Sequence, residues 1–186
     1  MGIPYATPPV NANRLSPTRA PTKWRGVLTA VAHPPACPQR PPKKYQRLFQ
    51  HQSEDCLYLN IYVPGEWPLP QHLRARNVAW AALLPTRDGA ATSPVLVLLH
   101  GESFEWGSGS AYDGSLLATL GDLIVVTLNF RLGILGFLNP HAEPHRPAVT
   151  NNGLMDQLAA LHWLHENIAS FGGDPAHVRQ TLCGVS

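Results

Sequence analysis

The stretch "VLVLLHGES", residues 95–103, runs from an apolar segment straight into a His-Gly turn. Residues 95–99 are Val and Leu only, and such a short continuous run, followed by turn residues, predicts a strand buried on both faces of a parallel sheet. A strand that is followed by glycine and small residues usually leads into a turn whose backbone N–H groups form a cradle for an anion. Here the turn carries a carboxylate of its own, Glu102. Any function assigned to this turn has to be compatible with that negative charge.

The regions after this turn predict a second buried strand and a helix that packs on the sheet. A second apolar run, "LIVVTL" at 123–128, predicts another buried strand. Residues 154–171 predict a helix that covers the sheet, with Asn152 as its cap and Gly172 and Gly173 as its stop. The expected apolar positions, at helical spacing, are Leu154, Leu158, Leu161, Leu164, Ile168 and Phe171. The fold class is therefore α/β, a mostly parallel central sheet with flanking helices.

The regions before the turn are more varied. The first forty-odd residues are rich in proline and predict an ordered loop over the core. Residues 57–63 alternate apolar and polar side chains, which indicates a half-buried strand near a sheet edge. Residues 65–94 carry little signal and are longer than a compact connection needs, so we interpret them as an insertion or loop.

Composition excludes several functions. The 186 residues, 44% hydrophobic and 14% charged, suit one globular unit, and a net charge of +2 with scattered cations argues against a nucleic-acid groove. No apolar run approaches the roughly 20 residues of a membrane helix. His51, His100, His162 and His165 lack partners at metal-ligand spacing, so no metal site is expected.

Two cysteines flank a polar loop that contains proline and lysine. Cys37 and Cys56 stand at the ends of this loop. A disulfide between them would indicate an oxidising compartment, whereas buried free cysteines are ordinary core residues. The residues alone leave both alternatives open.

Several motifs, read in order, resemble the type-B carboxylesterase and cholinesterase family, which has an α/β-hydrolase fold. They are "GIPYATPPV", "ACPQ", "SEDCLYLNIYVP", "HGESFEWGSGSAYDGSLLA", "VVTLNFRLGILGFL", "NNGLMDQLAALHWLHENIASFGGDP" and "GVS". Within this family the neuroligins, an adhesion branch, are the most similar, through "HGES" with a following aromatic residue and through "AYDGSLLA". The resemblance covers 1–186 except the insertion, as the N-terminal part of the family domain.

The resemblance implies an ectodomain that is extracellular or at the cell surface and that needs no cofactor. It also implies a neurexin-like cell-surface partner, and a full-length protein that can form a homodimer. It also implies structural pairs within the chain. Cys37 and Cys56 match the family's first disulfide. Two ion pairs are implied as well, Arg14 with Glu54 and Arg131 with Asp174.

In active relatives the His-Gly turn continues with further glycines, whose N–H groups help to form the oxyanion hole. Here Gly101 is followed by Glu102 and Ser103. A carboxylate near a developing anion raises the barrier, so we interpret the turn as catalytically silent. The alternative is that Glu102 faces solvent or forms a salt bridge and leaves the turn intact.

The last three residues match the start of the nucleophile elbow Gly-x-Ser-x-Gly, with Ser186 at the nucleophile position. In this fold the acid and the histidine of the triad follow the serine, and all nine histidines here precede it. Three hypotheses follow: part of a catalytically inactive, neuroligin-like adhesion ectodomain; a secreted carboxylesterase that acts through an acyl-serine; or a truncated chain with no independent function. The sequence "HGES" favours the first.

Overall fold

The computed structural model describes residues 1–64, 92–138 and 151–183. Within these ranges, five strands form one sheet in the order β1-β2-β4-β3-β5. The strands are β1 (Ile3–Pro4), β2 (Tyr58–Tyr62), β3 (Ser93–His100), β4 (Ile124–Leu128) and β5 (Gly173–Cys183). The helices are α2 (Ser115–Gly121), α3 (Gly133–Phe137) and α4 (Asn152–Asn167), with short 3-10 turns η1 (Asn11–Asn13), η2 (Lys43–Phe49), η4 (Gly109–Ala111) and η5 (Ile168–Phe171).

The sheet is mixed. The pairs β4–β3 and β3–β5 are parallel, whereas β1 and β2 join by antiparallel pairing, β2 against β4. A parallel pair needs a crossover connection, and α2 provides the one between β3 and β4. The strands β4, β3 and β5 are thus parallel to one another, and the turn after β3 follows the central one of these three.

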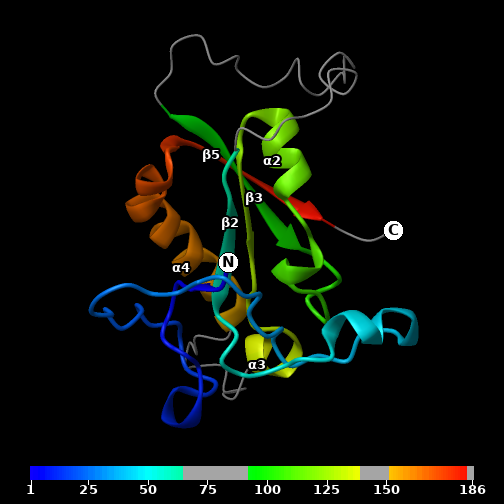
Figure 1. Cartoon of the computed structure of the whole chain (residues 1–186). Coiled ribbons are helices and arrows are strands. Elements are labelled where there is room, and N and C mark those ends of the chain that lie inside the picture. Colours follow the sequence, from blue (N-terminus) through cyan, green and yellow to red (C-terminus); the bar gives the residue numbers. More distant parts are fainter. Residues whose placement is uncertain (65–91, 139–150, 184–186) are drawn as a thin grey trace.

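Side chains from β3 and β4 alternate between the two faces of the sheet. Val95, Val97 and Leu99 belong to a core that includes Leu164 of α4, whereas Leu98 packs in a smaller core with Ala118 of α2. Figure 1 shows α4 and α2 on opposite sides of the strands. The continuous apolar runs within β3 and β4 therefore serve to bury both faces of the sheet.

The predicted strands at 57–63, 95–99 and 123–128 and the predicted helix are confirmed as β2, β3, β4 and α4 with η5. The predicted insertion at 65–94 lies outside the described residues up to position 91, and its last two residues belong to β3, which begins at Ser93.

Two details of the predicted helix were wrong. Asn152 does not cap α4: it is the first helical residue, and its side-chain amide donates to the carbonyl of Leu15. Leu154 and Leu158 are exposed by 40% and 57%, because the side of α4 that packs inward carries Asp156, Ala160 and Leu164. These three residues follow one another at four-residue spacing and so share one side of the helix.

Candidate functional site

The turn after β3, residues 101–106, lies at the carboxyl end of a parallel strand, the edge where open α/β sheets bind ligands. Ser103 and Phe104 both have positive φ, 54° and 60°, which is uncommon for residues with a side chain. The N–H of Ser103 donates to the carbonyl of Gly101 at 2.6 Å, and the N–H of Glu105 donates to the carbonyl of Glu102 at 3.0 Å. Hydrogen bonds inside the turn thus engage the N–H that follows Glu102.

Further contacts hold this turn in place. Glu102 and Trp106 form an isolated antiparallel bridge, and the carbonyl of Phe104 accepts the N–H of Gly133 at 2.9 Å. Trp106 stacks on Tyr45 of η2, with ring centroids 5.0 Å apart. The turn is therefore tied both to the start of α3 and to the loop between the two cysteines.

His100 anchors the turn to the core. Its ring is 1% exposed and stacks on Phe130, with centroids 4.1 Å apart and planes 4° from parallel. Gly107, at φ 130°, packs so closely that a Cβ there would lie 2.7 Å from Nδ1 of His100. Neither ring nitrogen has a hydrogen-bond partner in the described part of the chain. Burial lowers the pKa of His100 from 6.5 to about 3.

This lowered pKa predicts acid sensitivity. Between pH 6.5 and pH 3 the unfolded chain binds a proton at His100 that the folded chain does not, so stability falls as the pH falls through this window. From pH 7 to pH 5 we expect a loss of about 2 kcal/mol in the free energy of unfolding. Urea unfolding at each pH measures it. His100→Phe should remove most of this loss, and the exposed control His165→Gln should keep it; equal slopes in all three proteins would contradict the assignment.

Two side-chain amides, the half-buried Gln39 and the buried Asn129, connect the turn to the N-terminal loop. The side chain of Gln39 donates to the carbonyl of Gly107 and accepts its N–H, both at 2.8 Å. The side-chain oxygen of Asn129 accepts from the Ser108 hydroxyl and from the N–H of Gly109, and its NH₂ group donates to the carbonyl of Pro35. Sequence reasoning missed both amides, although Gln39 comes two residues after Cys37 and Asn129 comes directly after β4.

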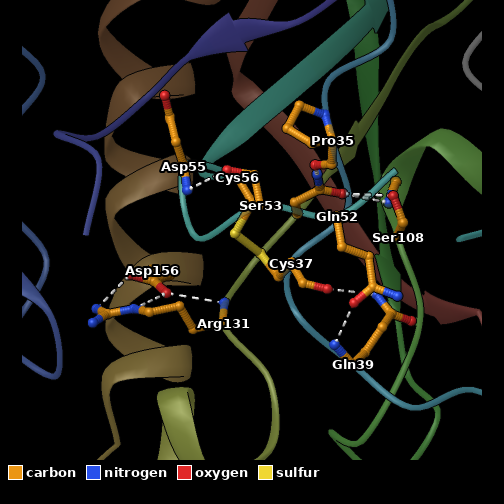
Figure 2. Close-up of a disulfide and its surroundings, with 12 residues drawn as sticks. Pro35, Cys37, Gln39, Gln52, Ser53, Asp55, Cys56, Ser108, Arg131 and Asp156 are labelled. Atoms are coloured by element: carbon orange, nitrogen blue, oxygen red, sulfur yellow. Dashed lines mark hydrogen bonds and ion pairs between the residues drawn. A yellow bond between two sulfur atoms is a disulfide. The ribbon is translucent and has the colours of Figure 1, made fainter. Parts of the chain in front are cut away.

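The disulfide implied by the resemblance is present. Cys37 and Cys56 are bonded, with Cα atoms 5.1 Å apart, and both are fully buried. Figure 2 shows this bond between Gln39 on one side and the pair Arg131 and Asp156 on the other. The disulfide therefore fixes the N-terminal loop from which Gln39 reaches the turn.

One of the two expected ion pairs is present, and the other was wrong. Arg14 contacts Glu54 at 2.7 Å. Arg131 does not pair with Asp174; it pairs with Asp156, through Nε to Oδ2 at 2.8 Å and Nη2 to Oδ1 at 2.9 Å (Figure 2).

The reason lies in where the two carboxylates are placed. Asp156 points from α4 toward the end of β4 and is fully buried, and it also accepts the backbone N–H of Arg131. Asp174 lies at the start of β5, where its carboxylate contacts the ring of His177 and accepts the N–H of Ala176. The hydrogen bond from His177 lowers the pKa of Asp174.

Other predicted site features are less defined. Ser186 lies outside the described residues. No group of His, Cys, Asp and Glu side chains in the described ranges is arranged to hold a metal ion. None of the helices in these ranges combines the length and apolarity that crossing a lipid bilayer requires.

Comparison with known proteins finds two kinds of relative. The chain is 45% identical to neuroligin-2 of Mus musculus over 96% of its length, and 37% identical to neuroligin-3 of Mus musculus over its whole length. It is also 43% identical to para-nitrobenzyl esterase of Bacillus subtilis over its whole length. The chain spans 23% and 24% of the two neuroligins and 34% of the esterase.

Solved structures point to the same family. A thermophilic PNB esterase superimposes with a TM-score of 0.75 at 41% identity, over 98% of this chain and 34% of that one. Another PNB esterase structure gives a TM-score of 0.76 over the whole chain and 34% of its own length, again at 41% identity. The fold is thus the α/β-hydrolase fold. Because residues 1–186 match the carboxylesterase family throughout, the chain belongs to that family.

Proposed function

We propose that this chain is the N-terminal part of a neuroligin-like, catalytically inactive ectodomain at the cell surface. The observation that carries the proposal is the turn after β3. Glu102 and Ser103 occupy the positions where active relatives have glycines, and the N–H of Ser103 donates to the carbonyl of Gly101 at 2.6 Å. An oxyanion hole needs N–H groups that point at the developing negative oxygen.

The backbone geometry and the charge act in the same direction. An N–H that already bonds inside the turn must break that bond before it can stabilise an oxyanion. Glu102 also brings a carboxylate into this turn, and negative charge there opposes the negative charge that develops on an oxyanion. Both features raise the barrier to acyl transfer.

The adhesion role itself rests on the similarity to neuroligins. By that similarity, the partner is a neurexin-like cell-surface protein, and the whole protein forms a homodimer. The disulfide between the buried Cys37 and Cys56 supports an extracellular location, since such bonds persist in oxidising compartments.

The second candidate is a carboxylic ester hydrolase that acts through an acyl-serine, with Ser186 as its nucleophile. It is favoured by the 43% identity to para-nitrobenzyl esterase, which extends over the whole chain. This identity is close to that with the neuroligins, so identity alone does not discriminate between the two functions. The turn does.

An assay of the whole protein, with any sequence that follows Ser186, separates the two functions. We expect hydrolysis of p-nitrophenyl acetate at the same rate as by the variant Ser186→Ala, and aggregation of cells that display the protein with cells that display a neurexin-like ectodomain. Turnover that disappears in Ser186→Ala would establish the hydrolase and refute the inactive ectodomain. Absence of aggregation would refute the adhesion partner.

A further inference from the structure

A groove of about 660 Å³ runs between residues 18–24 and α4, and it shares no residue with the turn after β3. Figure 1 shows the blue N-terminal segment beside the orange helix α4. Tyr5 lines the groove from the core side, and the indoles of Trp24 and Trp163 line it as well. Its volume is in the range of about 300 to 1,000 Å³ that is typical of small-molecule sites.

Hydrogen bonds fix residues 18–20 of the N-terminal wall of the groove. The carbonyl of Arg19 accepts the N–H of Thr7 at 2.9 Å, and the carbonyl of Ala20 accepts the hydroxyl of Thr7 at 2.6 Å. The hydroxyl of Thr18 donates to the buried carboxylate of Asp156 at 2.5 Å. These bonds hold residues 18–20 in place without a ligand, so binding would require little ordering of this part of the wall.

The charges that line the groove favour an anion. Arg19 and Lys23 are exposed, and neither forms an ion pair with another side chain in the described ranges. Glu166 is the single carboxylate among the lining residues, so the two cations exceed it by one charge. A guanidinium and an ammonium without an ion-pair partner in the part of the chain that the structure describes can both bind a carboxylate through charge-assisted hydrogen bonds.

The aromatic lining indicates the rest of the ligand. Trp24 is 46% exposed, so its indole presents a flat apolar surface on which an aromatic ring can stack. We propose that the groove binds a small aromatic carboxylate, with its ring against Trp24 and Trp163 and its carboxylate against Arg19 and Lys23. This site is independent of the proposed adhesion function.

The test is a titration of the full chain with 4-(trifluoromethyl)benzoate, followed by ¹⁹F NMR. We expect a Kd of about 1 mM or tighter, as suits a ligand of this size. The neutral analogue 4-(trifluoromethyl)benzamide should bind at least about fivefold more weakly, and the double variant Arg19→Gln/Lys23→Gln should weaken benzoate binding by the same factor. Trp24→Ala should weaken both ligands. The matched control Arg25→Gln removes a neighbouring cation that does not line the groove and should leave the Kd unchanged.

Three results would overturn the proposal. One is that the ¹⁹F signal of the benzoate is not broadened by the protein at ligand concentrations up to about 10 mM, a range that detects even weak millimolar binding. Another is equal benzoate affinity in the parent and in Arg19→Gln/Lys23→Gln. The third is tighter binding of the cation 4-(trifluoromethyl)benzylammonium that is lost in Glu166→Gln, which would assign the groove to cationic ligands.

Discussion

Replacing Asp156 by alanine is expected to destabilise the protein by about 3 to 5 kcal/mol, or to prevent folding altogether. Its carboxylate is fully buried and accepts from the backbone N–H, Nε and Nη2 of Arg131 and from the hydroxyl of Thr18. Removing it leaves the guanidinium of Arg131, only 3% exposed, with the carbonyl of Ser16 as its strongest remaining partner. A buried charge without a counter-ion carries most of its desolvation cost.

Urea unfolding of the parent and of Asp156→Ala at neutral pH measures this loss. The control is Glu166→Ala, which removes an exposed carboxylate from the same helix and should change stability by no more than about 0.5 kcal/mol. Arg131→Met/Asp156→Leu removes both charges together and should recover much of the loss, because no buried charge remains. A loss below about 1 kcal/mol in Asp156→Ala would show that the pair is not a major support of the fold.

The strands and helices could be predicted because each depends on a local pattern. Continuous apolar runs at 95–99 and 123–128 produce strands whose successive side chains enter two different cores. The spacing of apolar residues after 152 was also sufficient for a helix. It was not sufficient for the helix face, since the buried side of α4 includes a charged residue, Asp156, that a count of apolar positions leaves out.

The polar contacts could not be predicted from local patterns, because their partners are distant in the sequence. Asp156 lies 25 residues after Arg131, and Gln39 lies 68 residues before Gly107. The resemblance suggests Asp174 as the partner of Arg131, and it is the packing of α4 on the sheet that selects Asp156 instead. The groove between residues 18–24 and α4 has the same origin, since its two walls come from opposite ends of the chain.

The turn after β3 was predictable in its chemistry and not in its geometry. The carboxylate of Glu102 and the loss of glycine at position 103 are visible in the sequence. The positive φ of Ser103 and Phe104 and the bond from the N–H of Ser103 to Gly101 depend on how the chain leaves β3. Both φ values lie in the left-handed region that glycine adopts without strain, so glycine at position 103 would fit this backbone.

The inactivity of this turn can be tested most directly in an enzyme that is otherwise complete. Residues 100–104, "HGESF", would replace the aligned residues of para-nitrobenzyl esterase from Bacillus subtilis, and kcat/KM for a p-nitrophenyl ester would be measured. A matched graft, with glycine at the positions of Glu102 and Ser103, controls for the exchange itself. Circular dichroism of both grafts would verify that they fold.

Loss of a single oxyanion donor costs about 100-fold or more in rate, so the graft with Glu and Ser should lose at least that factor in kcat/KM. The glycine graft should retain activity close to that of the parent esterase. A folded graft with Glu and Ser whose kcat/KM stays within about threefold of the parent would contradict the account, because this turn would then support acyl transfer.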